Sequence, residues 1–340
     1  MRKFLMTVAR FFGIGLLPVL AMVPVYLILD PFKVVHSYDV FYPANEKGTV
    51  GLNKSFIGTA NFIKFKDQHN YDSFIFGNSR SMFYQVSDWK KYLPDNSTCY
   101  HFDGSGESLY ALHKKVRFVD SLGMPIKNVL LVLDRSLLAQ VEGRTGPLFM
   151  TPPPLVNNSN FIDFHISYFK SFISPRFMIA YLDFTLTHVI KPYMIKGGYL
   201  YDNLAVHDIV TNEIRFEFTE KQIAENKFYT PERIREFYHR DGKPSYSERV
   251  IETTQRRMLT DIAKTFKKHN TQYKVIISPL YDQQMLNAAD LRYLKSIYGA
   301  KNVYDYSGIN KFTSDYRNYY ETSHYRPHIG REILGDVYEN

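Results

Sequence analysis

The sequence predicts an α/β fold built on a parallel β-sheet that helices cover on both faces. Two observations indicate it: short apolar runs recur along the chain, and amphipathic stretches with helical periodicity lie between them. Parallel strands are usually joined by a helix, and the resulting sheet is buried on both sides, so its strands read as continuous apolar runs. The chain of 340 residues with a single cysteine is long enough to bury such a core without disulfides. Functional groups are then expected at the carboxyl ends of the strands.

Five segments have the length and composition of buried strands. They are residues 73–76, 98–102, 128–133, 273–278 and 302–306. Helices are expected at residues 108–122, 247–269 and 283–298 and after Pro327. In the segment 247–269, apolar residues fall on one face of a helix, which indicates that this face packs on the sheet: Ile251, Met258, Ile262 and Phe266.

The N-terminal segment predicts a membrane anchor. Residues 11–29 contain no charged side chain, and a helix of this length spans roughly 28 Å. Arg2, Lys3 and Arg10 precede the run, so the positive-inside rule places the N-terminus in the cytoplasm and the rest of the chain on the other side. A cleaved signal peptide is the alternative, but the run is longer than a usual signal core and lacks a convincing cleavage site. We expect an uncleaved single-pass anchor in the cytoplasmic membrane, with the main domain in the periplasm or outside the cell.

The predicted organisation has three parts. Residues 1–30 form the cytoplasmic tip and anchor, residues 31–70 a linker that leads into the domain, and residues 71–340 the α/β domain. Residues 141–243 interrupt the alternation of strands and helices, are rich in aromatic side chains, and are expected to form a helical insertion or cap on the sheet. Helical pieces are expected within it at about 161–172 and 177–190.

Composition limits the kinds of partner. The 45% of hydrophobic residues excludes a disordered chain. The net charge of +8 is spread without a block of five like charges, which disfavours nucleic-acid binding. The 27 Tyr and 26 Phe suit contacts with sugars or partners, although Tyr also fills cores.

Two short motifs carry the chemistry. Ser79 follows the first strand, where a strand-to-helix turn exposes a serine hydroxyl beside backbone N–H groups, although a serine here is also a common helix N-cap. Near the C-terminus, Glu321 lies three residues before His324, in a loop that Pro327 stiffens. A histidine oriented by a carboxylate is what a serine nucleophile requires.

Other kinds of site fit less well. The Gly-x-Ser-x-Gly turn of α/β-hydrolases would need glycine at position 81, which is Ser81. His324 and His328 have metal-ligand spacing with Glu321 as a third ligand, but Pro327 between them favours a helix start. No phosphate-binding Gly-x-x-x-x-Gly-Lys loop occurs. We therefore expect neither a metal nor a cofactor.

Three segments resemble conserved blocks of the SGNH/GDSL hydrolase superfamily. Residues 77–80, 101–108 and 321–324 resemble its blocks I, II and V in order and strand context. Within the superfamily the chain is most similar to membrane-anchored envelope proteins that accompany a membrane-bound O-acyltransferase, including those of alginate O-acetylation and teichoic acid D-alanylation. Asp30-Pro31-Phe32 directly after the anchor adds to this similarity.

The resemblance implies a flavodoxin-like three-layer α/β/α sandwich and a role for each matched residue. Ser79 would be the nucleophile, His324 the general base and Glu321 the residue that orients it. The backbone N–H groups of Ser79 and Gly104, or alternatively Gly106, would form the oxyanion hole.

The chain departs from the family pattern at two positions. Glu321 replaces the usual Asp, and Asp134 stands where the oxyanion-hole Asn of block III is expected. Loss of an oxyanion donor typically lowers the rate by about 10²–10³-fold. Arg80 or Arg135 is a candidate cationic substitute, and both residues, with Asp134, are candidate substrate contacts.

Two functions are predicted. The first is a serine acyl-transfer enzyme, either an O-acetyl/acyl transferase or an esterase, that acts on an extracytoplasmic envelope polysaccharide or acylated glycan through a Ser79 acyl intermediate. The alternative is a non-catalytic partner or scaffold of a membrane-bound O-acyltransferase or polysaccharide-export complex.

Overall fold

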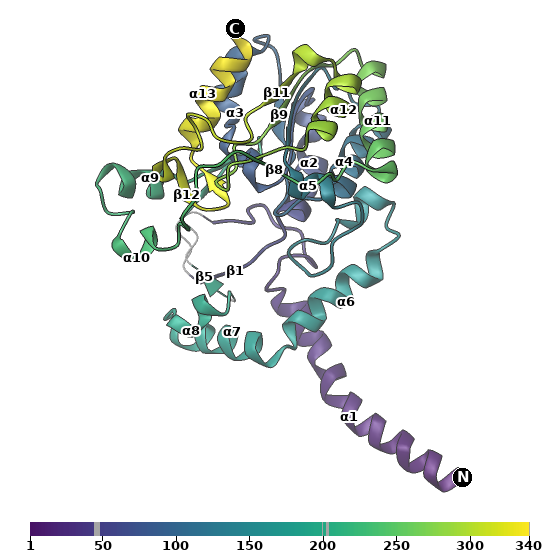
Figure 1. The fold of residues 1–340 in the computed structure, drawn as a ribbon. Coiled ribbons are helices and arrows are strands. Elements are labelled where there is room, and N and C mark those ends of the chain that lie inside the picture. Colours follow the sequence, from purple (N-terminus) through teal and green to yellow (C-terminus); the bar gives the residue numbers. More distant parts are fainter. Residues whose placement is uncertain (44–47, 199, 202–203, 340) are drawn as a thin grey trace.

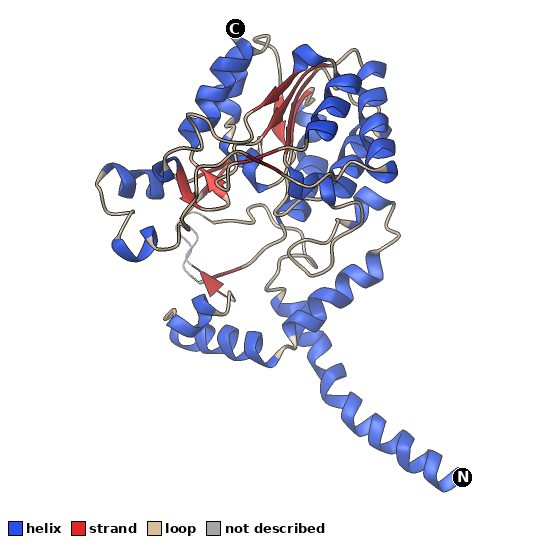
Figure 2. Cartoon of the chain, in the orientation of Figure 1, coloured by secondary structure: helices blue, strands red, loops and turns tan. Residues whose placement is uncertain are grey.

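The computed structural model describes all residues except 44–47, 199, 202–203 and 340; the side chains of residues 2–3, 5, 7–16 and 201 also lie outside the described part. A five-stranded, entirely parallel sheet forms the centre of the fold (Figures 1 and 2). Its strand order is β11-β9-β4-β2-β3. The strands are β2 (Ser73–Phe76), β3 (Cys99–His101), β4 (Asn128–Leu133), β9 (Gln272–Ile277) and β11 (Val303–Asp305).

Helices cover both faces of this sheet, as predicted. Alternate strand residues enter two separate cores, so that Phe74 and Phe76 of β2 face one core and Ile75 the other. The first face packs against α2 (Lys54–His69), α4 (Leu109–Ser121), α11 (Thr253–Lys268) and α12 (Ala288–Tyr298). The second packs against α3 (Val86–Trp89) and α13 (Pro327–Tyr338).

All five predicted strands are present within a residue or two, but two helices begin later than predicted. Before α11, the backbone N–H groups of Val250 and Ile251 donate to the Asp290 carboxylate, which holds this stretch outside the helix. Before α12, Gln283 has a φ of 59°, and the side chain of Asn287 caps the helix by accepting from the N–H of Ala289. Local polar contacts, rather than periodicity, set both helix starts.

Residues 54–69, expected as part of the linker, instead form α2 and belong to the sheet's first core. Phe62 is fully buried among the rings of Tyr71, Tyr100 and Phe102. The buried side of α2 also carries polar residues, Lys54 among them, which conceal its helical periodicity. The folded domain therefore begins before Tyr71.

The interruption predicted at 141–243 consists of short helices and two-residue strands. The helices α6 (Phe161–Phe172), α7 (Pro175–Thr187) and α8 (Pro192–Lys196) pack on Tyr26 and Phe32 in a third core, away from the sheet (Figure 1). A loop of the same segment covers the edge of β3, because the N–H of His101 donates to the carbonyl of Thr211 at 2.8 Å. This contact closes an otherwise open sheet edge.

The remaining elements are α1, at the N-terminus, and short helices and strands between these layers. The helices are α1 (Arg2–Leu29), α5 (Arg135–Ala139), α9 (Glu217–Ala224) and α10 (Pro231–Ile234), and the 3₁₀ helices are η1 (Ser79–Phe83), η2 (Lys90–Tyr92), η3 (Pro153–Val156), η4 (Ala300–Asn302) and η5 (Tyr316–Asn318). The strands are β1 (Thr49–Val50), β5 (Leu200–Tyr201), β6 (Val206–His207), β7 (Ile214–Arg215), β8 (Ser245–Tyr246), β10 (Gln284–Met285), β12 (Tyr319–Glu321) and β13 (His324–Tyr325).

The predicted anchor lies in α1, which projects away from the rest of the molecule (Figure 1). Within the part of the chain that the structure describes, no helix has both the length and the apolarity needed to cross a membrane. The side chains of residues 11–16, part of the expected span, lie outside that part.

Two glycines of α13 are expected to respond oppositely to alanine. A Cβ at Gly330 would lie 2.7 Å from the carbonyl carbon of Phe83, so Gly330→Ala must push α13 away from η1 and should cost about 1–3 kcal/mol. At Gly335 the nearest atom would be 3.8 Å away, so Gly335→Ala should be neutral or stabilising through helix propensity. Thermal unfolding followed by the fluorescence of Trp89, the only tryptophan, measures both. Equal midpoints for the two variants would contradict the packing.

Candidate active site

Ser79 lies at the carboxyl end of β2, on the turn into η1. The N-cap of η1 is Asn78, whose side-chain oxygen accepts from the N–H of Arg80 at 3.0 Å. Asn78 therefore fills the role of helix N-cap, which was the alternative role considered for Ser79. Gly77 permits the turn, because a Cβ there would lie 2.8 Å from the carbonyl oxygen of Val132 on β4.

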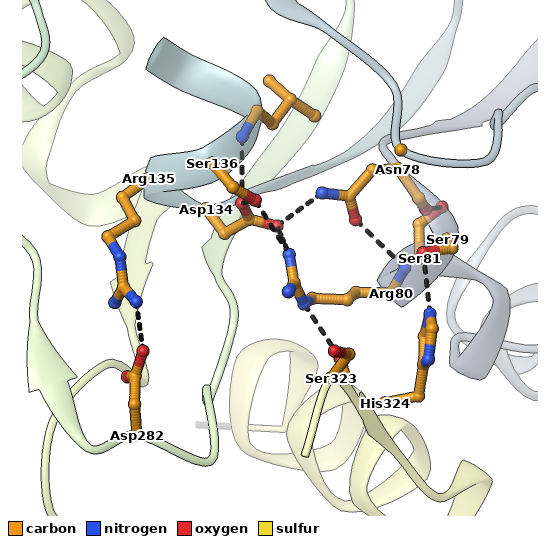
Figure 3. Close-up of polar contacts among 12 residues, drawn as sticks. Asn78, Ser79, Arg80, Ser81, Asp134, Arg135, Ser136, Asp282, Ser323 and His324 are labelled. Atoms are coloured by element: carbon orange, nitrogen blue, oxygen red, sulfur yellow. Dashed lines mark hydrogen bonds and ion pairs between the residues drawn. The ribbon is translucent and has the colours of Figure 1, made fainter. Parts of the chain in front are cut away.

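His324 and Glu321 face each other across a hairpin of β12 and β13, where the sequence predicted only a loop. His324 Nε2 lies 2.8 Å from Ser79 Oγ (Figure 3), and His324 Nδ1 contacts Glu321 Oε1. Thus the structure brings together the three residues predicted as nucleophile, base and orienting carboxylate, from positions more than 240 residues apart in the chain.

The charge state of Glu321 determines which nitrogen of His324 carries a proton. Burial opposes ionisation of Glu321, but hydrogen bonds from His324 and from the N–H of Ser323 outweigh it and hold the pKa of the carboxyl below its usual value. An ionised Glu321 only accepts hydrogen bonds, so Nδ1 of His324 donates to it. When Nδ1 carries the only proton of the ring, Nε2 accepts from Ser79. This is the arrangement that lets a histidine remove a serine proton.

The site occupies the point where the strand order reverses. From β2 the chain first adds β3 on one side and then β4 on the other. Ser79 follows β2 and Asp134 follows β4, and these two strands are neighbours in the sheet. The chain leaves β2 toward one edge of the sheet and β4 toward the other, so both residues flank the crevice between the two connections. Ligands of open α/β sheets commonly bind at this position.

Of the two glycines predicted for the oxyanion hole, Gly104 lies beside the serine. It forms a parallel β-bridge with Asn78, the residue before Ser79. Gly106 lies in the following turn at a φ of 53°, and its carbonyl accepts from Arg144 at 2.7 Å. The position of Gly104 makes it the better candidate donor.

Asp134, at the position expected to hold an oxyanion Asn, is 1% exposed and engaged by its neighbours (Figure 3). Its Oδ2 accepts from Asn78 Nδ2 at 2.6 Å and from Arg80 Nη1 at 2.8 Å, and its Oδ1 caps α5 through the N–H of Leu137 at 3.0 Å. Burial opposes its charge, but Arg80 and these hydrogen bonds outweigh burial and lower its pKa. An ionised Asp134 cannot donate to an oxyanion.

The two arginines near the site are also held by protein groups. Arg80 donates to Asp134 and, through Nε, to the carbonyl of Ser323 at 3.0 Å, so it ties the β2 turn to the hairpin that carries His324. Arg135 extends away from Ser79 and pairs with Asp282 (Figure 3). In this structure both arginines hold neighbouring segments of the chain together.

A buried charged network around residues 103–107 was not predicted. Lys54 pairs with Asp103 at 2.5 Å, and Lys115 pairs with Glu107, all four side chains being at most 5% exposed. Lys115 lies on the apolar face of α4, where its spacing from Leu112 and Val119 could have revealed it. The network fixes residues 103–107, the segment that carries Gly104.

A second Ser–His pair lies within the same region but has different chemistry. Ser81 Oγ donates to the carbonyl of Asn78 at 2.8 Å, so His101 Nε2, at 3.1 Å, must donate to Ser81. Burial lowers the pKa of His101 to about 4 and keeps it neutral. Ser81 and His101 are fully buried and therefore support the turn.

His328 does not join His324, because its Nε2 lies 3.1 Å from Asn318 Oδ1. Among the described residues, no three His, Cys, Asp or Glu side chains are grouped to hold a metal ion.

No protein-family model matches the chain, and no curated protein matches it significantly.

Proposed function

We propose that the protein is a membrane-anchored serine acyl-transfer enzyme of SGNH type that acts on an envelope polysaccharide outside the cytoplasm. One observation carries this proposal: Ser79 Oγ lies 2.8 Å from His324 Nε2, while Nδ1 of the same ring is held by Glu321. A surface histidine or a capping serine needs no such ordered contact.

The proposed reaction has two steps. Ser79 Oγ attacks the carbonyl carbon of an acyl ester while His324 takes the serine proton, and Glu321 stabilises the resulting imidazolium. The backbone N–H groups of Ser79 and Gly104 hold the oxyanion, and collapse of the intermediate releases the donor alcohol with the proton from His324. In the second step His324 removes the proton of an accepting sugar hydroxyl or water, which attacks the acyl-serine and frees Ser79.

The strand order supports a flavodoxin-like fold for this enzyme. Numbered along the chain within the sheet, the strands lie in the order second, first, third, fourth, fifth, which is the flavodoxin-like order. The placement of the candidate nucleophile at the reversal point of this order agrees with the SGNH assignment.

The location and the substrate are proposed from the sequence pattern of α1. An apolar N-terminal helix behind three basic residues supports a cytoplasmic-membrane anchor with the domain outside. An envelope polysaccharide is the polymer that such a domain meets, and a membrane-bound O-acyltransferase is the proposed partner that supplies the acyl group.

A scaffold without catalytic activity remains the second candidate, and Asp134 favours it. A buried acceptor stands where an oxyanion donor is expected, and Arg80 is engaged by Asp134 and Ser323. In this alternative the protein would bind the acyltransferase without forming an acyl-serine.

Covalent labelling distinguishes the two candidates. The full-length protein in lipid nanodiscs, treated with a fluorophosphonate probe, is expected to be labelled at Ser79, as identified by peptide mapping. His324→Ala should abolish labelling, whereas the matched variant His328→Ala should retain it, because His328 contacts Asn318 instead of Ser79. Folded wild-type protein that is not labelled would reject the activated serine and favour the scaffold.

A further inference from the structure

Helix α7 carries apolar side chains on two opposite sides. Phe177 and Ala180 are buried in the third core. Ile179, Leu182 and Leu186 are exposed, with Leu186 81% exposed. A helix that is apolar on both sides is typical of one that has a second apolar neighbour.

Helices α6 and α8 and the turn before α8 also carry exposed apolar side chains. We call the exposed apolar side chains of these helices the outer face of α6–α8; they are Phe161, Ile162, Ile166, Ile179, Leu182, Leu186, Val189, Tyr193 and Ile195. Single exposed apolar residues need no explanation, but nine of them along three consecutive helices indicate an interaction surface.

The outer face belongs to the layer of the molecule from which α1 departs (Figure 1). The ring of Tyr26 in α1 packs on Phe169 and Phe172 of α6, with ring centroids 5.7 and 5.4 Å apart. Ile28, in the last turn of α1, is 77% exposed. Exposed apolar side chains therefore continue from α1 to the helices packed beside it.

The charges of this layer favour a negatively charged surface. Residues 161–198 contain four basic residues (Lys170, Arg176, Lys191 and Lys196), two aspartates and no glutamate. Asp183 and Lys191 pair with each other at 2.7 Å, which leaves Lys170, Arg176 and Lys196 against Asp163. Apolar residues flanked by Lys and Arg are typical of helices that lie in the interface of an anionic bilayer.

We infer that the outer face of α6–α8 lies in the headgroup region of the lipid bilayer beside α1. This inference rests on the anchor in the proposed function but not on the chemistry of Ser79. It assigns the insertion a role in holding the domain at a fixed orientation on the membrane, where α1 alone would be a single point of attachment.

Site-directed fluorescence quenching tests the inference. Leu186→Cys, labelled with bimane, is compared with Glu332→Cys on α13, at the end of the molecule away from α1 (Figure 1). The full-length variants are reconstituted in nanodiscs of phosphatidylethanolamine and phosphatidylglycerol, with and without headgroup-region doxyl lipids. Cys99, the only native cysteine, is buried, and unlabelled wild type controls for it.

Doxyl lipids are expected to quench the Leu186→Cys label at least about twofold and the Glu332→Cys label hardly at all. A third label at Leu20→Cys, in the middle of the expected span, reports on α1 in nanodiscs whose lipids carry the doxyl group on the acyl chain. Quenching at Leu20 without quenching at Leu186 would overturn the inference while leaving the anchor intact. No quenching at either position would overturn both the anchor and the docking surface. Labelling of Ser79 by the fluorophosphonate is independent of each outcome.

Discussion

Replacing Ser79 with alanine is expected to lower the rate at which the protein releases p-nitrophenol from p-nitrophenyl acetate by at least about 10⁴-fold. The variant lacks the oxygen that His324 Nε2 contacts at 2.8 Å, so it cannot form the acyl intermediate. The measurement compares the rate constant per protein molecule with that of wild type, after both proteins show the same thermal midpoint.

Variants of His324 and Glu321 extend this test of Ser79. Because nucleophile and base act as a unit, Ser79→Ala, His324→Ala and the double variant should all lose about the same rate. Glu321→Ala should lose less of the rate, because Glu321 only orients His324 and the variant keeps both the nucleophile and the base. Losses that simply multiply in the double variant would contradict a shared step. A rate unaffected by Ser79→Ala would exclude Ser79 as the nucleophile.

The central sheet could be predicted from the sequence because each strand is a short apolar run that needs burial on both faces. The helix α2 could not, because Lys54 enters the core only together with Asp103, a partner 49 residues away. Spacing along one segment does not identify a distant counter-charge. The late start of α11 has a similar cause, since Asp290 holds the preceding residues.

The same limit applies to the site. Ser79 and the Glu321–His324 pair could be predicted because each motif is local and follows a recognisable strand or precedes a proline. The roles of Asp134, Arg80 and Asn78 could not, because the sequence does not say which of the neighbouring cations and carboxylates pair. Arg80 was predicted as a candidate donor to the substrate, whereas the folded chain directs it to Asp134 and to the carbonyl of Ser323.

The buried position of Asp134 predicts the largest loss of stability. Asp134→Ala removes the counter-charge of Arg80, an acceptor for Asn78 and the cap of α5 at once. Removing one partner of a buried ion pair typically costs about 3–5 kcal/mol. Urea unfolding of the full-length protein, followed by Trp89 fluorescence, should show this loss. The control is Asp282→Ala, which breaks the more exposed pair with Arg135 and should cost clearly less.

The pH dependence of this loss separates charge from packing. Since the folded pKa of Asp134 is lowered, its charge contributes fully above the unfolded value of about 3.9, and the contribution disappears as pH falls through the folded pKa. The difference in unfolding free energy between wild type and Asp134→Ala should therefore be constant from pH 5 to 7, on the order of the full loss, and should shrink below about pH 4. A difference that stays constant down to pH 3 would mean that Asp134 acts through its shape alone. In that case the charge of Asp134 would not contribute to the link that Arg80 forms between the serine turn and the hairpin that carries His324.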